Sequence, residues 1–173
     1  MTLRAPVAAA CLAALGCATG GGVPIGGATY QPGTDFGSYR TFDFITVPAG
    51  GSRIVATLDY YGVDGVLARD LGTVGLTRSI GGTPDLYVAY FQGGMQVDVR
   101  DWGYSTAGNP VAEILDVPSA CLVVDVVDAS KKVLVWRGIA TDALASPQSV
   151  DPAVRQMLQG WPGRQAQPRQ QGW

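Results

Sequence analysis

The 173-residue chain contains no histidine, and charged residues make up only 15% of it. Without histidine the chain cannot perform Ser-His-Asp or Cys-His catalysis, and with only three cysteines nearly all zinc sites are excluded as well. Lysine and arginine number 12 against 14 acidic residues, which gives a net charge of −2. This balance predicts neither nucleic-acid binding nor attraction to an anionic membrane surface.

The amino terminus has the layout of a secretory signal. Arg4 precedes a mostly apolar run at residues 5–15, which is too short to cross a bilayer, because a spanning helix needs about 20 residues. A short basic start followed by an apolar core of this length is typical of export signals. The other interpretation is an ordinary buried helix, but the Gly/Thr/Pro-rich stretch 18–27 then gives no reason for a helix boundary.

The apolar run ends in Ala14-Leu15-Gly16-Cys17. Small residues before a cysteine resemble the lipobox of bacterial lipoproteins, in which a peptidase cuts before the cysteine and diacylglycerol is attached to its sulfur. Ala14 stands where leucine is commoner. We therefore expect cleavage between Gly16 and Cys17, with the lipid on Cys17; Cys11 is the weaker alternative, because it lies too close to Arg4.

Lipid on Cys17 predicts a stable membrane anchor, because two or three acyl chains hold a protein where one is marginal. Ala18 follows in place of the aspartate that retains lipoproteins at the inner membrane of enterobacteria. In a host with two membranes we expect the outer membrane, with the protein facing the periplasm.

The expected organisation is a signal peptide at residues 1–16, a lipidated cysteine and flexible tether at 17–33, one domain at 34–161 and a disordered tail at 162–173. The tether is rich in Gly, Thr and Pro, and the tail in Gln, Pro, Gly and Arg. Only Cys121 would keep a free thiol, and its apolar surroundings predict a buried, inert side chain.

Hydrophobic periodicity predicts an α+β fold with an antiparallel sheet of about five strands and two helices packed on one face. Gly93-Gly94 predicts a hairpin between the second and third strands, and the sequence Asp128-Ala129-Ser130-Lys131 predicts a turn between the last two. These last two strands are almost continuously apolar, which indicates cover on both faces. The predicted strands are 39–47, 85–91, 95–102, 120–127 and 132–140, and the predicted helices are 58–74 and 149–158.

Three motifs then resemble a family of bacterial lipoproteins, the one catalogued as domain of unknown function 4136. They are residues 34–42 (TDFGSYRTF), residues 83–88 (TPDLYV) and residues 133–140 (VLVWRGIA), and Pro162 after the last helix also fits. The resemblance covers roughly residues 34–163. Residues 50–65 depart from the pattern, with more glycine than expected. No activity is implied by the resemblance.

No group of residues predicts catalysis, a metal site or a cofactor site. Within a strand, Asp98 and Asp101 would point to opposite faces, so they make a poor acid/base or metal pair. Arg137 stands in an apolar strand and needs a partner, because an unpaired buried charge is very costly. Asp125 on the neighbouring strand is the candidate partner, and we expect a structural ion pair between the two.

Two functions stay open at this point, and neither is enzymatic. The first is an anchored envelope protein that binds or scaffolds another envelope component. The second is a binding module for a small or apolar ligand, held between sheet and helices and lined by Tyr60, Tyr61, Tyr87 and Tyr90. Aromatic residues at these spacings are more often part of a core, so the first is preferred.

Overall fold

The computed structural model describes residues 27–45, 61–106 and 111–163. Eight strands and two α-helices make up the fold. The strands are β1 (Gly27–Tyr30), β2 (Thr41–Phe44), β3 (Thr77–Arg78), β4 (Leu86–Gln92), β5 (Met95–Asp98), β6 (Ile114–Val117), β7 (Leu122–Asp128) and β8 (Val133–Ala140). The helices are α1 (Val63–Thr73) and α2 (Pro147–Met157), with 3₁₀ turns at η1 (Val99–Trp102) and η2 (Leu158–Gly160).

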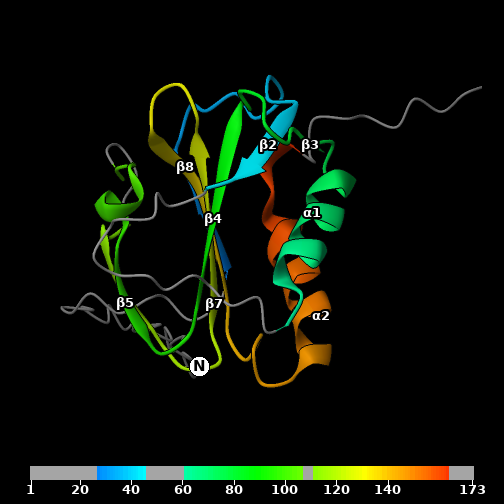
Figure 1. Cartoon of the computed structure of the whole chain (residues 1–173), viewed down its shortest axis with the longest axis vertical. Helices are drawn as coiled ribbons and strands as arrows, with labels where there is room; N and C mark the ends of the chain where they lie inside the picture. The colour runs from blue at the N-terminus through cyan, green and yellow to red at the C-terminus, as the bar shows by residue number, and fades with distance from the viewer. Residues whose placement is uncertain (1–26, 46–60, 107–110, 164–173) are drawn as a thin grey trace, which may run out of the picture.

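Three layers are stacked in the molecule, as Figure 1 shows. The middle layer is a six-stranded sheet with the order β1-β8-β7-β4-β2-β3. Helices α1 and α2 cover one of its faces, and a two-stranded ribbon of β5 and β6 covers part of the other. β7 is buried along its whole length and β8 at every residue after the first, which confirms the prediction that these strands are covered on both faces.

Each face of the sheet has its own apolar core. Leu67, Leu71, Val150 and Val154 of the helices pack on the helix face, together with Trp161 after them. On the opposite face, Val97, Leu115 and Val117 of the ribbon and Val99 of η1 pack against the main sheet. Their partners in the sheet include Phe91 of β4 and Val123 of β7.

The sheet is mixed, so the prediction of an antiparallel sheet was wrong in part. β2 pairs in parallel with β4 and with β3, whereas β7 is antiparallel to β4 and β8. Parallel neighbours need a long crossover, and α1 lies within the connection from β2 to β4. The sequence pattern predicted a strand, a helix and a strand where β2, α1 and β4 lie, but it did not predict that β2 and β4 run in the same direction.

Several elements differ from the predicted ones. No hairpin forms over Gly93-Gly94, because β5 leaves the sheet and pairs with β6, which was not predicted. The predicted strand 95–102 ends at Asp98, whose carboxylate accepts a hydrogen bond from the Arg100 amide and begins η1. Strand β1 lies within the stretch predicted as a tether and pairs with β8.

Helix α1 starts five residues later than predicted, and residues 58–60 lie outside the described part of the chain. Gly62 precedes it with a φ of 67°, in the left-handed region that glycine adopts without strain. The predicted stop is correct: Gly75 follows with a φ of 95°. The last predicted helix, 149–158, corresponds to α2 and η2.

Gly138 makes room for the largest side chain of the helix-face core. Trp136, fully buried, lies two residues earlier on β8 and on the same face, and Met157 of α2 packs above the glycine. A Cβ at position 138 would overlap both Trp136 Cη2 and Met157 Sδ. Packing in this core therefore depends on the absence of a side chain at one position.

We expect Gly138→Ala to lower the free energy of unfolding by about 1–3 kcal/mol or more, because the added methyl overpacks the core. Gly72→Ala is the matched control: Gly72 lies within α1 with nothing within 4 Å of an added Cβ, so alanine should stabilise by up to about 1 kcal/mol. Urea unfolding of both variants measures the difference, and equal midpoints would contradict this account of the core.

Candidate functional site

Asp125 and Arg137 form an ion pair in the centre of the sheet. They are direct partners across β7 and β8, on the face that the ribbon covers. Arg137 Nε lies 2.6 Å from Asp125 Oδ1, and Nη2 lies 2.6 Å from Oδ2, so the contact is bidentate. The side chain of Arg137 is 2% exposed and that of Asp125 is 0% exposed. The structure thus brings the two predicted partners together, directly opposite each other on neighbouring strands.

Tyr104 completes the pair with a hydrogen bond. Its hydroxyl donates to Asp125 Oδ2 at 2.6 Å. Burial and the adjacent carboxylate raise the pKa of Tyr104 well above its usual value, so the hydroxyl stays protonated and remains a donor. Burial disfavours the charge of Arg137, but the bonds to Asp125 outweigh it and the pKa of the guanidinium is raised.

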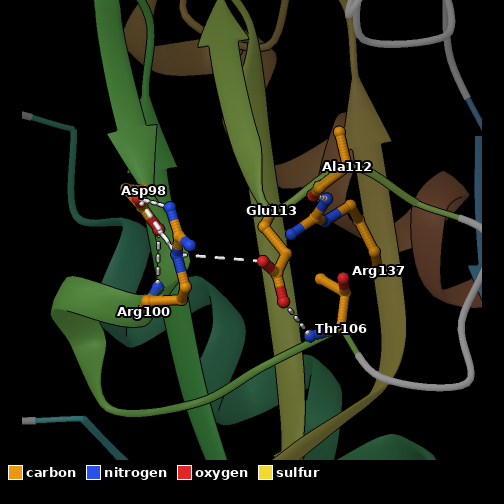
Figure 2. Close-up of polar contacts among 6 residues, drawn as sticks. All are labelled: Asp98, Arg100, Thr106, Ala112, Glu113 and Arg137. Atoms are coloured by element: carbon orange, nitrogen blue, oxygen red, sulfur yellow. Dashed lines mark hydrogen bonds and ion pairs between the residues drawn. The ribbon is translucent and has the colours of Figure 1, made fainter.

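Arg137 also connects the sheet to the segment that leads into β6. Its Nη1 donates to the Ala112 carbonyl at 2.9 Å. Figure 2 shows this contact beside a second one, in which Glu113 accepts from the Thr106 amide at 3.4 Å and lies 3.8 Å from Arg100 Nε. Arg100 is in turn paired with Asp98 at the end of β5. One guanidinium therefore helps to hold the ribbon layer on the sheet.

This network is arranged to stabilise the fold. The buried Asp125 accepts from Arg137 and Tyr104, and Arg137 donates to Asp125 and to the Ala112 carbonyl, so both buried charges have partners within the fold. Within the residues that the structure describes, no group of three or more Asp, Glu or Cys side chains could hold a metal ion. Asp98, set aside as a catalytic group, pairs with Arg100.

A second polar cluster lies at the end of the sheet where β2 and β4 begin. The Asp85 carboxylate accepts hydrogen bonds from the amides of Arg40 and Thr41, at 2.8 and 2.9 Å, and from the Thr41 hydroxyl at 3.0 Å. The Asp85 carbonyl accepts from the Ala129 amide at 3.0 Å. The first two amides lower the pKa of Asp85. Asp85 thus connects three loops that are far apart in the sequence.

Asp128 holds the neighbouring turn in the same way. Its Oδ1 accepts from the Ser130 hydroxyl and the Lys131 amide, at 2.6 and 2.9 Å, and its Oδ2 accepts from the Tyr39 hydroxyl at 2.9 Å. Burial alone would raise the pKa of Asp128, but these hydrogen bonds outweigh burial and hold it well below its usual range. The motifs at 34–42 and 83–88 therefore contact the turn at residues 128–131, which comes just before the motif at 133–140.

A hollow of about 420 Å³ opens beside this end, on the ribbon face. Tyr104 and Val127 lie buried at its base, and Ile45, Tyr87 and Trp102 are partly exposed around it. Asp43 and Lys132 add polar groups at its edge, and Lys132 Nζ lies 4.1 Å from the centroid of the Tyr87 ring. This hollow was not predicted from the sequence, because Trp102 belongs to a 3₁₀ turn that periodicity had assigned to a strand.

The tyrosines predicted to line one pocket do not come together. Tyr90 is buried in the core between sheet and helices, and Tyr61 packs against that core. Tyr87 points to the opposite face, since it is an odd number of residues from Tyr90 on the same strand. Tyr60 lies outside the described residues.

Gly16 and Cys17 also lie outside the part of the chain that the structure describes. Cys121 is buried as predicted, and burial raises the pKa of its thiol, which makes it a poor nucleophile. None of the helices within the described ranges is long and apolar enough to cross a membrane.

The family model described as "Domain of unknown function (DUF4136)" matches residues 27–163. The chain belongs to this family. The match begins at β1, so the family's domain includes the strand that sequence reasoning had placed in a tether. No curated protein matches the chain in sequence.

Solved structures resemble this DUF4136 domain in fold. A PDZ domain protein from Parabacteroides distasonis ATCC 8503 aligns with a TM-score of 0.50 and 16% sequence identity, over 79% of this chain. The alignment spans 35% of that longer protein. Two structures of a PelC dodecamer from Paraburkholderia phytofirmans align with TM-scores of 0.43 and 0.41, at 11% and 12% identity. Each covers 77% of this chain, and 95% and 93% of the PelC chains.

Arg137→Met is expected to lower the free energy of unfolding by about 3–5 kcal/mol, because it leaves the Asp125 charge buried without its partner. Asp125→Leu combined with Arg137→Met should recover most of this loss. Both are measured by urea unfolding in a Tyr104→Phe background, so that no hydroxyl is left without an acceptor. An unchanged urea midpoint in the Arg137→Met variant would rule out a stabilising pair.

The stability that Asp128 contributes should depend on acid pH. Because its folded pKa is lowered, the contribution is present above the unfolded value near 3.8 and is lost as pH falls below it. Asp128→Asn should therefore cost about 1–3 kcal/mol near pH 6, and the difference from the wild type should shrink toward pH 2. The exposed Asp101, changed to Asn, serves as control; parallel curves for Asp128→Asn and wild type would refute the assignment.

Proposed function

We propose that this DUF4136 protein is a lipid-anchored component of the bacterial cell envelope that binds another envelope molecule and performs no catalysis. The observation that carries the proposal is the sequence Ala14-Leu15-Gly16-Cys17 at the end of a short basic and apolar leader. Lipid on Cys17 would hold the domain at a membrane, which in a two-membrane host would be the outer one, facing the periplasm.

The anchor would give the domain a defined orientation. Nine residues lie between Cys17 and Gly27, where β1 begins, and the ten residue-to-residue steps span at most about 36 Å. Because β1 is antiparallel to β8, the first residue of β1 lies at the end of the sheet where β8 ends. This end of the sheet would therefore be the one near the membrane. The end with Asp85 and Asp128 is the opposite one, and it would face away from the membrane.

This membrane-distal end supports a binding role. Segments 35–41, 83–85 and 128–131 are fixed there by the hydrogen bonds of Asp85 and Asp128. Rigid loops held on a sheet are the usual place for binding residues. The hollow lined by Tyr87 and Trp102 opens beside the same loops, so small-ligand binding stays as the second candidate function.

The anchor is tested by labelling cells with tagged palmitate. The wild type should incorporate the label and lose residues 1–16, and Cys17→Ser should lack the label and keep the longer chain. Cys11→Ser is the matched control and should behave as the wild type. Label on Cys17→Ser, or none on Cys11→Ser, would overturn the assignment of Cys17.

Binding is tested in the same cells by photo-cross-linking. A photoreactive residue at position 131 lies at the end predicted to face away from the membrane, and one at position 141 lies at the end near the anchor. A partner captured from position 131, absent from position 141 and lost with Cys17→Ser, is the expected result. Capture from position 141 alone would contradict the orientation.

A further inference from the structure

The hollow beside Tyr87 exists because the ribbon layer is shorter than the sheet it covers. β5 and β6 have four residues each, and they pack on Ala89 and Phe91 in the second half of β4. Tyr87, near the start of β4, is left partly exposed at the edge of that layer. The result is a half-open cavity of about 420 Å³ with aromatic walls. Small-molecule sites have cavities of this size, with aromatic side chains beside a small number of polar groups.

Two polar side chains of the hollow, Asp43 and Tyr104, already have partners within the protein. The Asp43 carboxylate accepts from its neighbour's amide, that of Phe44, at 2.9 Å and pairs with Arg78 Nε at 3.2 Å. The Tyr104 hydroxyl donates to Asp125. Both side chains therefore already have polar partners within the protein and do not need a ligand to satisfy them.

Lys132 is the exception. Its ammonium lies over the Tyr87 ring, and within the described part of the chain no carboxylate lies within 4.0 Å of it. The adjacent Lys131 is different, because its Nζ lies 3.2 Å from Asp128 Oδ2. The φ of Lys132 is 57°, so the backbone at this turn is in the left-handed region. The hollow therefore combines aromatic and aliphatic wall side chains with one ammonium group at its edge that has no carboxylate partner among the described residues.

We propose that this hollow binds a small amphiphilic carboxylate: an apolar or aromatic body that fills the space between Tyr87, Trp102 and Ile45, with its carboxylate paired to Lys132. Burying the body removes its apolar surface and that of the walls from water. The carboxylate gains a charge-assisted hydrogen bond, and the ammonium keeps its contact with the ring.

Charge decides the class of ligand. A cationic ligand would be repelled by the ammonium of Lys132. The carboxylate of Asp43 would not offset this repulsion, because it is paired with Arg78. A neutral ligand of the same shape would gain only the apolar contact. This inference rests on the proposed binding role and not on the lipid anchor, because every residue in it belongs to the folded domain.

The test uses the purified full chain, ¹⁵N-labelled, with 2-naphthoate as the probe and 2-naphthamide as its neutral counterpart. Where detergent is present, micelles with probe alone give the blank. Amide shifts are expected at Gly82, Gly103 and Lys132, together with the Trp102 indole. Naphthoate should bind about two- to fivefold more tightly than the amide, which is the range that one exposed ion pair allows.

Lys132→Met should abolish the preference for naphthoate, and Lys131→Met, the matched control, should keep it. Both side chains are exposed, so neither change should unfold the protein. Shifts elsewhere, no shifts, or equal affinity for the two probes in the wild type would each overturn the proposal. Because palmitate labelling tests the anchor separately, failure here and failure of the anchor give different results.

Discussion

The ion pair of Asp125 and Arg137 places two charges in the middle of the sheet, and much of the fold is arranged around satisfying them. A charge without a partner at this depth would cost several kcal/mol, so the strands, the loop at Tyr104 and the segment at Ala112 must all be in position together. This requirement joins the ribbon layer to the sheet through directional contacts as well as apolar burial. An apolar core alone tolerates sliding, because hydrophobic contact has no preferred direction. The pair therefore fixes where the ribbon sits, and with it the edge at which the hollow beside Tyr87 opens.

The two ends of the sheet are built differently. At one end Asp85 and Asp128 act as acceptors for loops from three parts of the sequence, and their lowered pKa values reflect how many donors converge on them. At the other end, where β1 starts and β8 finishes, a hollow of about 450 Å³ is lined mostly by small residues, together with Ile139, Met157 and two glutamines, from β1, β8, α2 and η2. The first end has rigid, shaped loops suited to recognition. The hollow at the second end has neither a charged nor an aromatic residue in its lining, which suits the side turned toward the proposed anchor.

The elements that could be predicted from the sequence are those that depend on residues close together along the chain. The apolar stripe of α1, its stop at Gly75 and the continuous runs of β7 and β8 were all visible, and Arg137 in an apolar strand indicated its need for Asp125. What could not be predicted depends on long-range geometry. The parallel pairing of β2 follows from a crossover, and β5 leaves the sheet because its partner β6 lies beyond a loop. β1 is too short and too rich in small residues to be distinguished from a linker; only its pairing with β8 makes it a strand. The hollow was missed for the same reason, since it results from the unequal lengths of two layers.

Both edges of the main sheet are short: β1 has four residues and β3 has two. Each edge therefore offers few unpaired backbone groups to an approaching strand, and this is one of the ways in which sheet proteins avoid joining edge to edge. The point matters most for molecules confined to a surface, where encounters between copies take place in two dimensions and at high local density. Copies of this domain on one membrane would meet through side chains and loops, whose contacts can be specific and reversible, and not through growth of a shared sheet.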